Sequence, residues 1–330
     1  MLSKNHDIAS FSDKLYKMTE NRTDLLTCLV DCLGGPWPVP RPLETLYGET
    51  IIKEGYRIES LSYESEETDR VPALLLVPDT VDEDNPAPGI TLWHQHNDEY
   101  HLGKSEPAGL AGSDMHHTGV SFVKEGYVVL CPDSLCFEER QDPDKKIKDR
   151  NYEHFEFLRY IVEGKSMAWK NILDMRRAVD FLVSRSEVDQ ERIGCYGHSM
   201  GSTHTWLVGP HEPRLKALLG NCCMPTYSAI NAKKIIHGFS NYVPRWIDYG
   251  DIPEIVSLIA PRPLHLNFGK NDEGSPIHYV NEGIQRIAHV YEEMEAKENF
   301  SFFVQEGVGH VLSDEMWEQT KSFFKKHLKL

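Results

Sequence analysis

The most informative stretch is the pentapeptide Gly197–Gly201, whose sequence GHSMG matches the pattern G-x-S-x-G. It follows the short apolar run Arg192–Tyr196 and precedes a stretch that can be helical. Between a strand and a helix, this pattern predicts a sharp, strained turn that presents a serine hydroxyl above a sheet. The helix N-terminus supplies a backbone N–H for an oxyanion. We therefore predict Ser199 as a nucleophile and Met200 N–H as an oxyanion donor; the alternative is a serine that only caps a helix.

Two later residues could supply the acid–base chemistry that a serine nucleophile needs. Asp272 follows an expected strand at 263–268, and His310 follows another at 300–305. Each lies just past the carboxyl end of its strand, which is the edge where open α/β sheets bind ligands. A histidine can take the serine proton, and a carboxylate can orient the imidazole. We predict Asp272 and His310 in these roles, with Glu273 as the nearest rival to Asp272 because the segment is rich in turn formers.

The composition is that of an ordinary globular protein, with 330 residues, 40% hydrophobic and 26% charged. The net charge of −16 argues against a general nucleic-acid binder, because phosphate neutralisation needs clustered Lys and Arg. No apolar run approaches the roughly 20 residues that a membrane helix needs. Residues 1–7 contain no apolar signal region. We therefore expect a cytoplasmic protein with no membrane partner.

Short apolar strands alternate with helical patterns along most of the chain. This alternation predicts an α/β fold with a mainly parallel central sheet and helices on both faces. The first two strands alternate apolar and polar residues and are expected to be antiparallel edge strands. The expected strands are 50–52, 56–61, 71–77, 89–93, 127–131, 192–196, 216–222, 263–268 and 300–305, and the expected helices are 8–33, 166–184, 279–295 and 315–327.

The domain organisation is expected to be simple. Residues 1–48 are predicted to form an N-terminal helical appendage, and residues 49–330 one catalytic domain. Within that domain, residues 224–260 lack strong periodicity and hold several aromatic side chains. We therefore take residues 224–260 as the candidate for a lid insertion over the site.

Several short sequence segments resemble those of a known family. From about Arg41 to its end, the chain resembles the alpha/beta-hydrolase superfamily, specifically its dienelactone-hydrolase and acetyl-xylan-esterase-like branch. The chain order serine, aspartate, histidine is also that of the superfamily. The resemblance implies an alpha/beta-hydrolase fold and a Ser-His-Asp hydrolase of carboxylic esters, with Ser199, His310 and Asp272 as the triad. The matching segments are Gly55–Glu59, Ser186–Gly194, Gly250–Pro253 and Ala260–Leu264.

The chain departs from the family pattern in two places. Dienelactone hydrolases use a cysteine nucleophile, whereas this chain has Ser199, which favours ordinary esters. The oxyanion loop of many relatives reads His-Gly-Gly-Gly, whereas His94–Asn97 reads HQHN here, directly after the strand ending at Trp93. The resemblance implies that this loop donates the second oxyanion N–H. We favour Gln95 as that donor, and the other N–H groups of the loop stay open.

The expected enzyme is a short-acyl or acetyl esterase that acts through an acyl-enzyme. Its substrate is expected to be a small-molecule ester, with no cofactor and no metal, and a homo-oligomer is left open. A peptidase or amidase with the same triad is the nearest alternative. The side chains expected around the substrate are Trp93, His94, His198 and Trp246.

Two alternative functions of other kinds, a metal-dependent hydrolase and a non-catalytic binding protein, remain. The run His94-x-His96-x-Asp98, with further histidines nearby, resembles the ligand pattern of metal-dependent hydrolases, although Glu99 stands where that pattern has another histidine. The second alternative is a non-catalytic binding protein, because some proteins with a hydrolase fold have lost the catalytic triad. The presence of all three triad candidates favours the serine enzyme over both.

Overall fold

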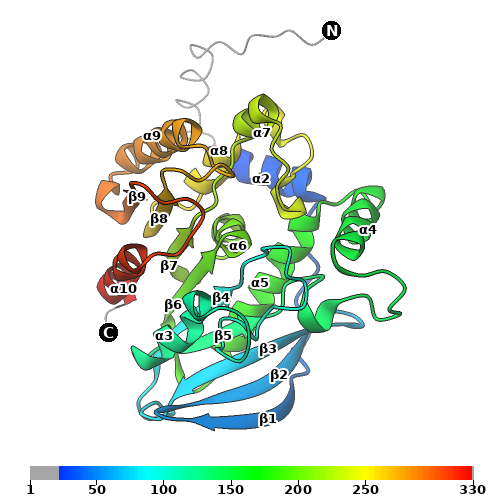
Figure 1. Ribbon diagram of the computed structural model, residues 1–330, viewed down its shortest axis with the longest axis vertical. Helices are drawn as coiled ribbons and strands as arrows, with labels where there is room; N and C mark the ends of the chain where they lie inside the picture. Colours follow the sequence, from blue (N-terminus) through cyan, green and yellow to red (C-terminus); the bar gives the residue numbers. More distant parts are fainter. Residues whose placement is uncertain (1–21, 329–330) are drawn as a thin grey trace.

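The computed structural model describes residues 22–328, and its scaffold is a nine-stranded sheet. Across the sheet the strands follow the order β1-β2-β3-β5-β4-β6-β7-β8-β9 (Figure 1). Their bounds are β1 Leu46–Lys53, β2 Tyr56–Glu66, β3 Asp69–Pro78, β4 Ala87–Trp93, β5 Val128–Pro132, β6 Val188–His198, β7 Leu215–Asn221, β8 Leu264–Gly269 and β9 Phe300–Gln305.

The sheet is antiparallel at one edge and parallel over the rest. β1 pairs with β2, β2 with β3 and β3 with β5 in antiparallel directions. All pairs from β5 through β4 to β9 are parallel. The turn from β1 to β2 uses Gly55 at φ 83°, a backbone conformation that glycine adopts without strain. The prediction of an α/β fold with a mainly parallel sheet is confirmed.

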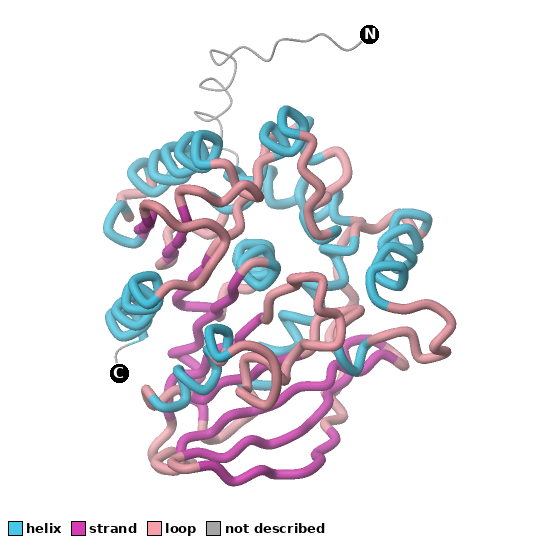
Figure 2. The backbone as a smooth tube through the Cα atoms, viewed as in Figure 1, coloured by secondary structure: helices cyan, strands magenta, loops and turns pink. Residues whose placement is uncertain are grey.

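Helices cover both faces of the sheet (Figures 1 and 2). The α-helices of the described residues are α2 Arg22–Leu33, α3 Thr118–Lys124, α4 Asp149–Val162, α5 Met167–Val183, α6 Met200–Val208, α7 Tyr227–Lys233, α8 Ile252–Ser257, α9 Ile277–Glu293 and α10 Asp314–Leu328. Short 3-10 helices are η1 Asp114–His116, η2 Glu138–Arg140, η3 Gly209–His211, η4 Phe239–Asn241, η5 Trp246–Asp248 and η6 Lys297–Asn299. None of the helices between residues 22 and 328 is long and apolar enough to cross a membrane.

Two apolar cores lie on opposite faces of the sheet. Along β5, Val128 and Leu130 belong to one core, while Val129 and Cys131 belong to the other. The larger core contains residues of α5, α6, α8 and α9, and the smaller one contains residues of α3 and α10. A strand buried on both faces reads as a continuous apolar run, which is why the sequence locates these strands so readily.

The observed elements agree with most of the expected ones. Each expected strand overlaps an observed strand, and the expected helices 166–184, 279–295 and 315–327 correspond to α5, α9 and α10. For the expected helix 8–33, the part within the described residues is α2, and residues 8–21 lie outside them. Helix α4 is a feature that the sequence patterns did not indicate.

Helix α2 packs on the larger core rather than standing apart from it. Leu29 and Leu33 are fully buried members of that core. Gly34 and Gly35, both at positive φ, then end the helix as expected. The division of the chain at residue 48 into an appendage and a catalytic domain stays a prediction.

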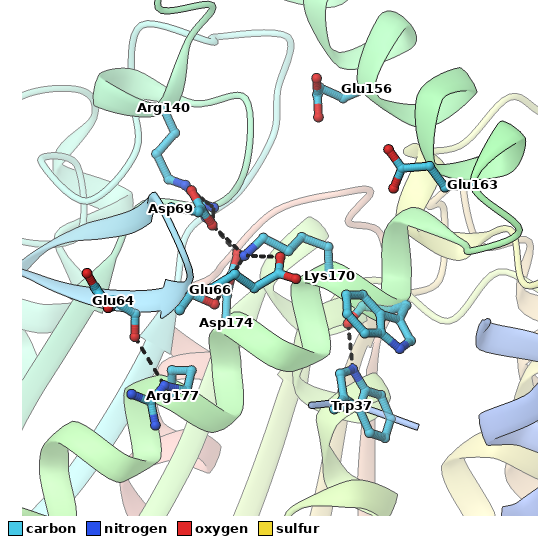
Figure 3. A network of polar contacts seen from close by, with 12 residues as sticks. Trp37, Glu64, Glu66, Asp69, Arg140, Glu156, Glu163, Lys170, Asp174 and Arg177 are labelled. Atoms are coloured by element: carbon cyan, nitrogen blue, oxygen red, sulfur yellow. Dashed lines mark hydrogen bonds and ion pairs between the residues drawn. The ribbon is translucent and has the colours of Figure 1, made fainter. Parts of the chain in front are cut away.

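A buried network of charges ties α5 to the loop that follows β5 (Figure 3). Lys170 Nζ lies 2.6 Å from Asp174 Oδ1 and also contacts Asp69, and Arg140 Nη1 lies 2.7 Å from Asp174 Oδ2. Burial alone would lower the pKa of Lys170, but Asp174 and Asp69 raise it above its ordinary value. The network therefore keeps both cations charged and fixes η2 against α5.

We predict that Asp174→Asn destabilises the fold by about 3 kcal/mol, because it leaves Lys170 and Arg140 buried with less compensating charge. Urea unfolding near pH 7 measures this change. Asp144→Asn is the control, since Asp144 pairs with Lys146 on the exposed surface, where such pairs contribute about 0–1 kcal/mol. A loss for Asp174→Asn no larger than that of the control would contradict the prediction.

Candidate active site

Ser199 lies on a strained turn between β6 and α6. Its backbone has φ 57° and ψ −116°, a conformation that non-glycine residues hold only when their surroundings impose it. The neighbouring glycines explain how the turn fits. A Cβ on Gly201 would lie 2.0 Å from the carbonyl oxygen of Trp93, and a Cβ on Gly197 would lie 2.1 Å from the Gly201 carbonyl carbon. The G-x-S-x-G pattern is therefore required by the close approach of β4, β6 and α6.

The structure brings Ser199, His310 and Asp272 together. His310 Nε2 lies 2.7 Å from Ser199 Oγ, and His310 Nδ1 lies 2.7 Å from Asp272 Oδ2. If Nδ1–H donates to the carboxylate, Nε2 is left to accept from the serine hydroxyl. The imidazole is 40% exposed and the Asp272 side chain 3%, so the histidine faces the open side of the site.

Asp272 sits where its carboxylate is stabilised in the ionised form. Burial alone would raise the pKa of Asp272, but the hydrogen bond and charge of His310, with backbone N–H groups, lower it below its ordinary value. One of those groups, Gly274 N–H, donates to Asp272 Oδ1 at 2.9 Å. The carboxylate can therefore orient the imidazole and stabilise an imidazolium.

The loop 94–97 lies against the start of α6, as its expected role requires. A Cβ on Gly201 would lie 3.1 Å from the His94 carbonyl oxygen, which shows how closely the two backbones approach. Ser134 N–H donates to His94 Nε2 at 3.0 Å, so His94 Nδ1 carries the proton and donates to the Gln95 carbonyl at 2.7 Å. Burial lowers the pKa of His94 to about 4, which keeps this ring neutral. The assignment of Gln95 N–H and Met200 N–H as oxyanion donors stays a prediction.

A cavity of about 410 Å³ opens beside Ser199, Asp272 and His310. The segment 236–241, within the expected lid 224–260, contributes a continuous part of its wall. Other parts of the wall come from the loop after β4, the start of α4, the start of α6 and the loops after β7 and β8. A small ester could reach Ser199 Oγ through this cavity, although the lid function of residues 224–260 stays a prediction.

None of the four side chains expected around the substrate is among those that line this cavity, so their place in a substrate site stays a prediction. Trp93, His94 and Trp246 are buried in the scaffold, and the Trp246 Nε1–H donates to the Asp251 carbonyl. His198 is buried beside His310, with the ring centres 5.5 Å apart, and Asn221 Nδ2 donates to its Nδ1 at 2.7 Å.

The metal alternative finds little geometric support among the described residues. His94 Nε2 accepts from Ser134 N–H, whereas His96 Nε2 lies 3.0 Å from Glu153 Oε2, so the two rings are committed to different partners. A different acidic group does converge, formed by Asp133, Glu138 and Glu139. Its centre is taken by the ammonium of Lys104, which lies 2.7–2.9 Å from an oxygen of each carboxylate.

Glu153 and Tyr100 are among the residues of the cavity wall that sequence reasoning missed. Glu153, on α4, is 3% exposed, and Tyr100 Oη donates to its Oε2 at 2.7 Å. No local sequence pattern could have identified them, because Glu153 contacts the loop after β4 only through the tertiary packing of α4. Phe239, from the expected lid, stacks on Phe157 of α4 and joins the two segments.

A serine on a strand-to-helix turn, with an acid and a histidine after later strands of a mostly parallel sheet, defines the alpha/beta-hydrolase fold. Residues 105–238 match the model of the Dienelactone hydrolase family. Over 305 residues the chain is 30% identical to the protein named "Putative hydrolase YtaP" of Bacillus subtilis (strain 168), covering 90% of this chain and 96% of that protein. The chain belongs to the dienelactone hydrolase family, which confirms the resemblance seen in its sequence.

Solved structures of esterases share the fold. A protein described as a "putative acetyl xylan esterase" from Bacteroides fragilis NCTC 9343 has a TM-score of 0.71 at 16% identity, covering 93% of this chain and 88% of that one. A glucuronoyl esterase from Solibacter usitatus has a TM-score of 0.68 at 15% identity, covering 94% and 93%. At these identities the likeness concerns the fold. Family and fold together identify a hydrolase with an esterase-like structure.

We predict that Gly201→Ala damages both folding and the site, because the added methyl group would overlap the Trp93 carbonyl. We expect a loss of about 1–3 kcal/mol, the range for overpacked positions, measured by urea unfolding. Gly48→Ala is the control, because its Cβ would come no closer than 3.3 Å to another atom, the hydroxyl oxygen of Ser60. Equal stability of the Gly201→Ala variant and the wild type would show that the elbow does not need this glycine.

Proposed function

We propose that this protein is a serine hydrolase that cleaves carboxylic esters through Ser199, His310 and Asp272. The observation that carries the proposal is the continuous line of hydrogen bonds from Asp272 through His310 to Ser199, each 2.7 Å long. Base-assisted attack by a hydroxyl needs contacts of this length. The line opens on a cavity, and the chain belongs to a family of hydrolases.

The reaction begins with attack by Ser199 Oγ on the ester carbonyl. A hydroxyl is a poor nucleophile at neutral pH, so His310 Nε2 takes its proton as the bond forms. The ionised Asp272 holds the imidazole in the required tautomer and stabilises the imidazolium. His310 then gives the proton to the departing alkoxide, and the acyl group stays on Ser199.

The tetrahedral oxyanion would be bound by the N–H groups of Met200 and Gln95. Met200 begins α6, so its N–H lies at the positive end of a helix dipole. Each such donor typically contributes about 10²–10³ in kcat. Water, activated by His310, then attacks the acyl-enzyme and releases the acid. These steps use protein groups and water.

The proposed substrate is an ester with a short acyl group, such as an acetyl ester. A cavity of about 410 Å³ lies in the lower part of the range for small-ligand sites. One solved neighbour is described as a "putative acetyl xylan esterase", which supports the acetyl preference by analogy of fold. Ser199 in place of a cysteine also favours ordinary esters.

We predict that Ser199→Ala folds normally and lowers kcat for p-nitrophenyl acetate by at least ~10³-fold. The wild type should cleave the acetate faster than p-nitrophenyl esters of longer acyl chains, and faster than amino-acid anilides. Circular dichroism of the variant provides the folding control. Turnover of the acetate by Ser199→Ala at a rate close to that of the wild type would reject the serine mechanism.

We predict that Asp272→Asn lowers kcat by on the order of 10³-fold, because a neutral amide no longer fixes the imidazole tautomer. Glu273→Gln is the matched change at the neighbouring carboxylate, and its fall in kcat should be smaller than that of Asp272→Asn by at least about tenfold. Steady-state rates of the two variants on the same ester decide between the carboxylates. A larger loss for Glu273→Gln would assign the acid role to Glu273 instead.

A further inference from the structure

The loop 94–97 is fixed by contacts from three other segments of the chain. Ser134 N–H holds the ring of His94, and Glu106 accepts a hydrogen bond from the Gln95 side chain at 3.1 Å. The third contact comes from Glu153, whose Oε2 lies 3.0 Å from His96 Nε2. Glu153 is on α4, which stands at the periphery of the molecule (Figure 1). A helix outside the sheet scaffold therefore reaches the loop that follows β4.

The hydrogen bonds around His96 define where its proton lies. Asp98 N–H donates to His96 Nδ1 at 3.0 Å, so Nδ1 acts as an acceptor. The proton is then on Nε2, which donates to Glu153. Each nitrogen of this ring has its own partner, and the ring also packs edge-on against Phe137, with the ring centres 5.0 Å apart. The side chain of His96 is consequently locked in one orientation.

A second donor meets the same carboxylate oxygen. Tyr100 Oη donates to Glu153 Oε2 at 2.7 Å, and the Tyr100 ring stacks on Phe137 with the ring centres 4.9 Å apart. Tyr100 and Phe137 form a small buried cluster with Met200. One oxygen of Glu153 thus joins the loop 94–97 to the packing around Met200.

The backbone that follows this loop turns sharply. Asn97 and Asp98 have φ values of 45° and 54°, in the left-handed region that asparagine and aspartate adopt more readily than other non-glycine residues. Burying a carboxyl group at 3% exposure is unfavourable unless it is well hydrogen-bonded. The carboxyl group of Glu153 is therefore buried in contact with the loop that follows β4, and its hydrogen bonds to His96 and Tyr100 compensate its burial.

We propose that Glu153 is a positioning residue for the oxyanion hole, holding the loop of Gln95 and the side chains packed on Met200 through its bonds to His96 and Tyr100. This inference rests on the proposed function. It assigns to α4 a role in the chemical step: without Glu153, the two N–H donors would no longer be held toward the same point. Because misplacement of reacting groups by about 1 Å can cost about 10²-fold, the effect belongs in kcat.

The test measures the steady-state kinetics of Glu153→Leu and Glu153→Gln on p-nitrophenyl acetate. It also measures the affinity of each variant for a trifluoromethyl ketone, which forms a tetrahedral adduct with serine. We expect Glu153→Leu to lower kcat about 10- to 100-fold, with KM changed by less than about threefold. The ketone should bind more weakly by a factor that parallels the loss in kcat. Since both bonds go to one oxygen, Glu153→Gln can keep both and should recover most of the lost kcat.

Glu156→Gln is the matched control, because Glu156 is buried on the same helix and bonds Arg159 instead. Its kcat should stay within about twofold of the wild type. A Glu153→Leu variant with the kcat of the wild type, with a change in KM alone, or with unaltered ketone affinity would overturn the proposal. If Glu153→Leu does not fold, His96→Phe removes the same contact from the loop side; it should show the same loss, and the kcat of the wild type in that variant would equally overturn the proposal.

The outcomes separate this inference from the proposed function. If the wild type has no ester turnover that depends on Ser199, the proposed function fails. If that turnover is present and Glu153→Leu retains it in full, only the positioning role of Glu153 fails.

Discussion

The strained backbone of Ser199 is the constraint on which the rest of the site depends. A φ of 57° turns the chain sharply enough to lift the hydroxyl off the end of β6 and start α6 one residue later. The turn is held from two sides. Ser199 N–H donates to the Asn221 carbonyl at the end of β7, at 2.8 Å, and Gly201 lies against the carbonyl of Trp93 at the end of β4. Relaxation of this turn would carry the hydroxyl away from His310.

Asp272 and His310 are also held in place by a close contact between loops, in this case the loops at the ends of two neighbouring strands. β8 and β9 are parallel, and the pairing continues past them, with Lys270 N–H donating to the Gln305 carbonyl and Asn271 N–H to the Val308 carbonyl. A Cβ on Gly269 would lie 2.0 Å from the Gly309 carbonyl oxygen, so the two loops touch. The pairing of β8 with β9 and of the loops after them thus fixes Asp272 and His310 relative to each other.

The sequence was sufficient for the parts of the site that depend on the sheet. Ser199 and His310 each follow an apolar run, and the carboxyl ends of parallel strands meet at one edge, so their convergence could be expected. The wall of the cavity could not be predicted in this way. Trp93 was expected near the substrate because of its place in the sequence, but strand residues beside a turn point into the core. Glu153 was missed because α4 exposes apolar side chains such as Phe155 and has no clear apolar face on the core.

The most direct measurement of the central claim is covalent labelling by a fluorophosphonate probe, followed by peptide mapping. A hydroxyl activated by His310 should form one phosphonate adduct per chain, located on Ser199, and ester turnover should fall in proportion to labelling. An adduct on a different residue would contradict the account, as would full turnover by protein whose Ser199 is completely labelled.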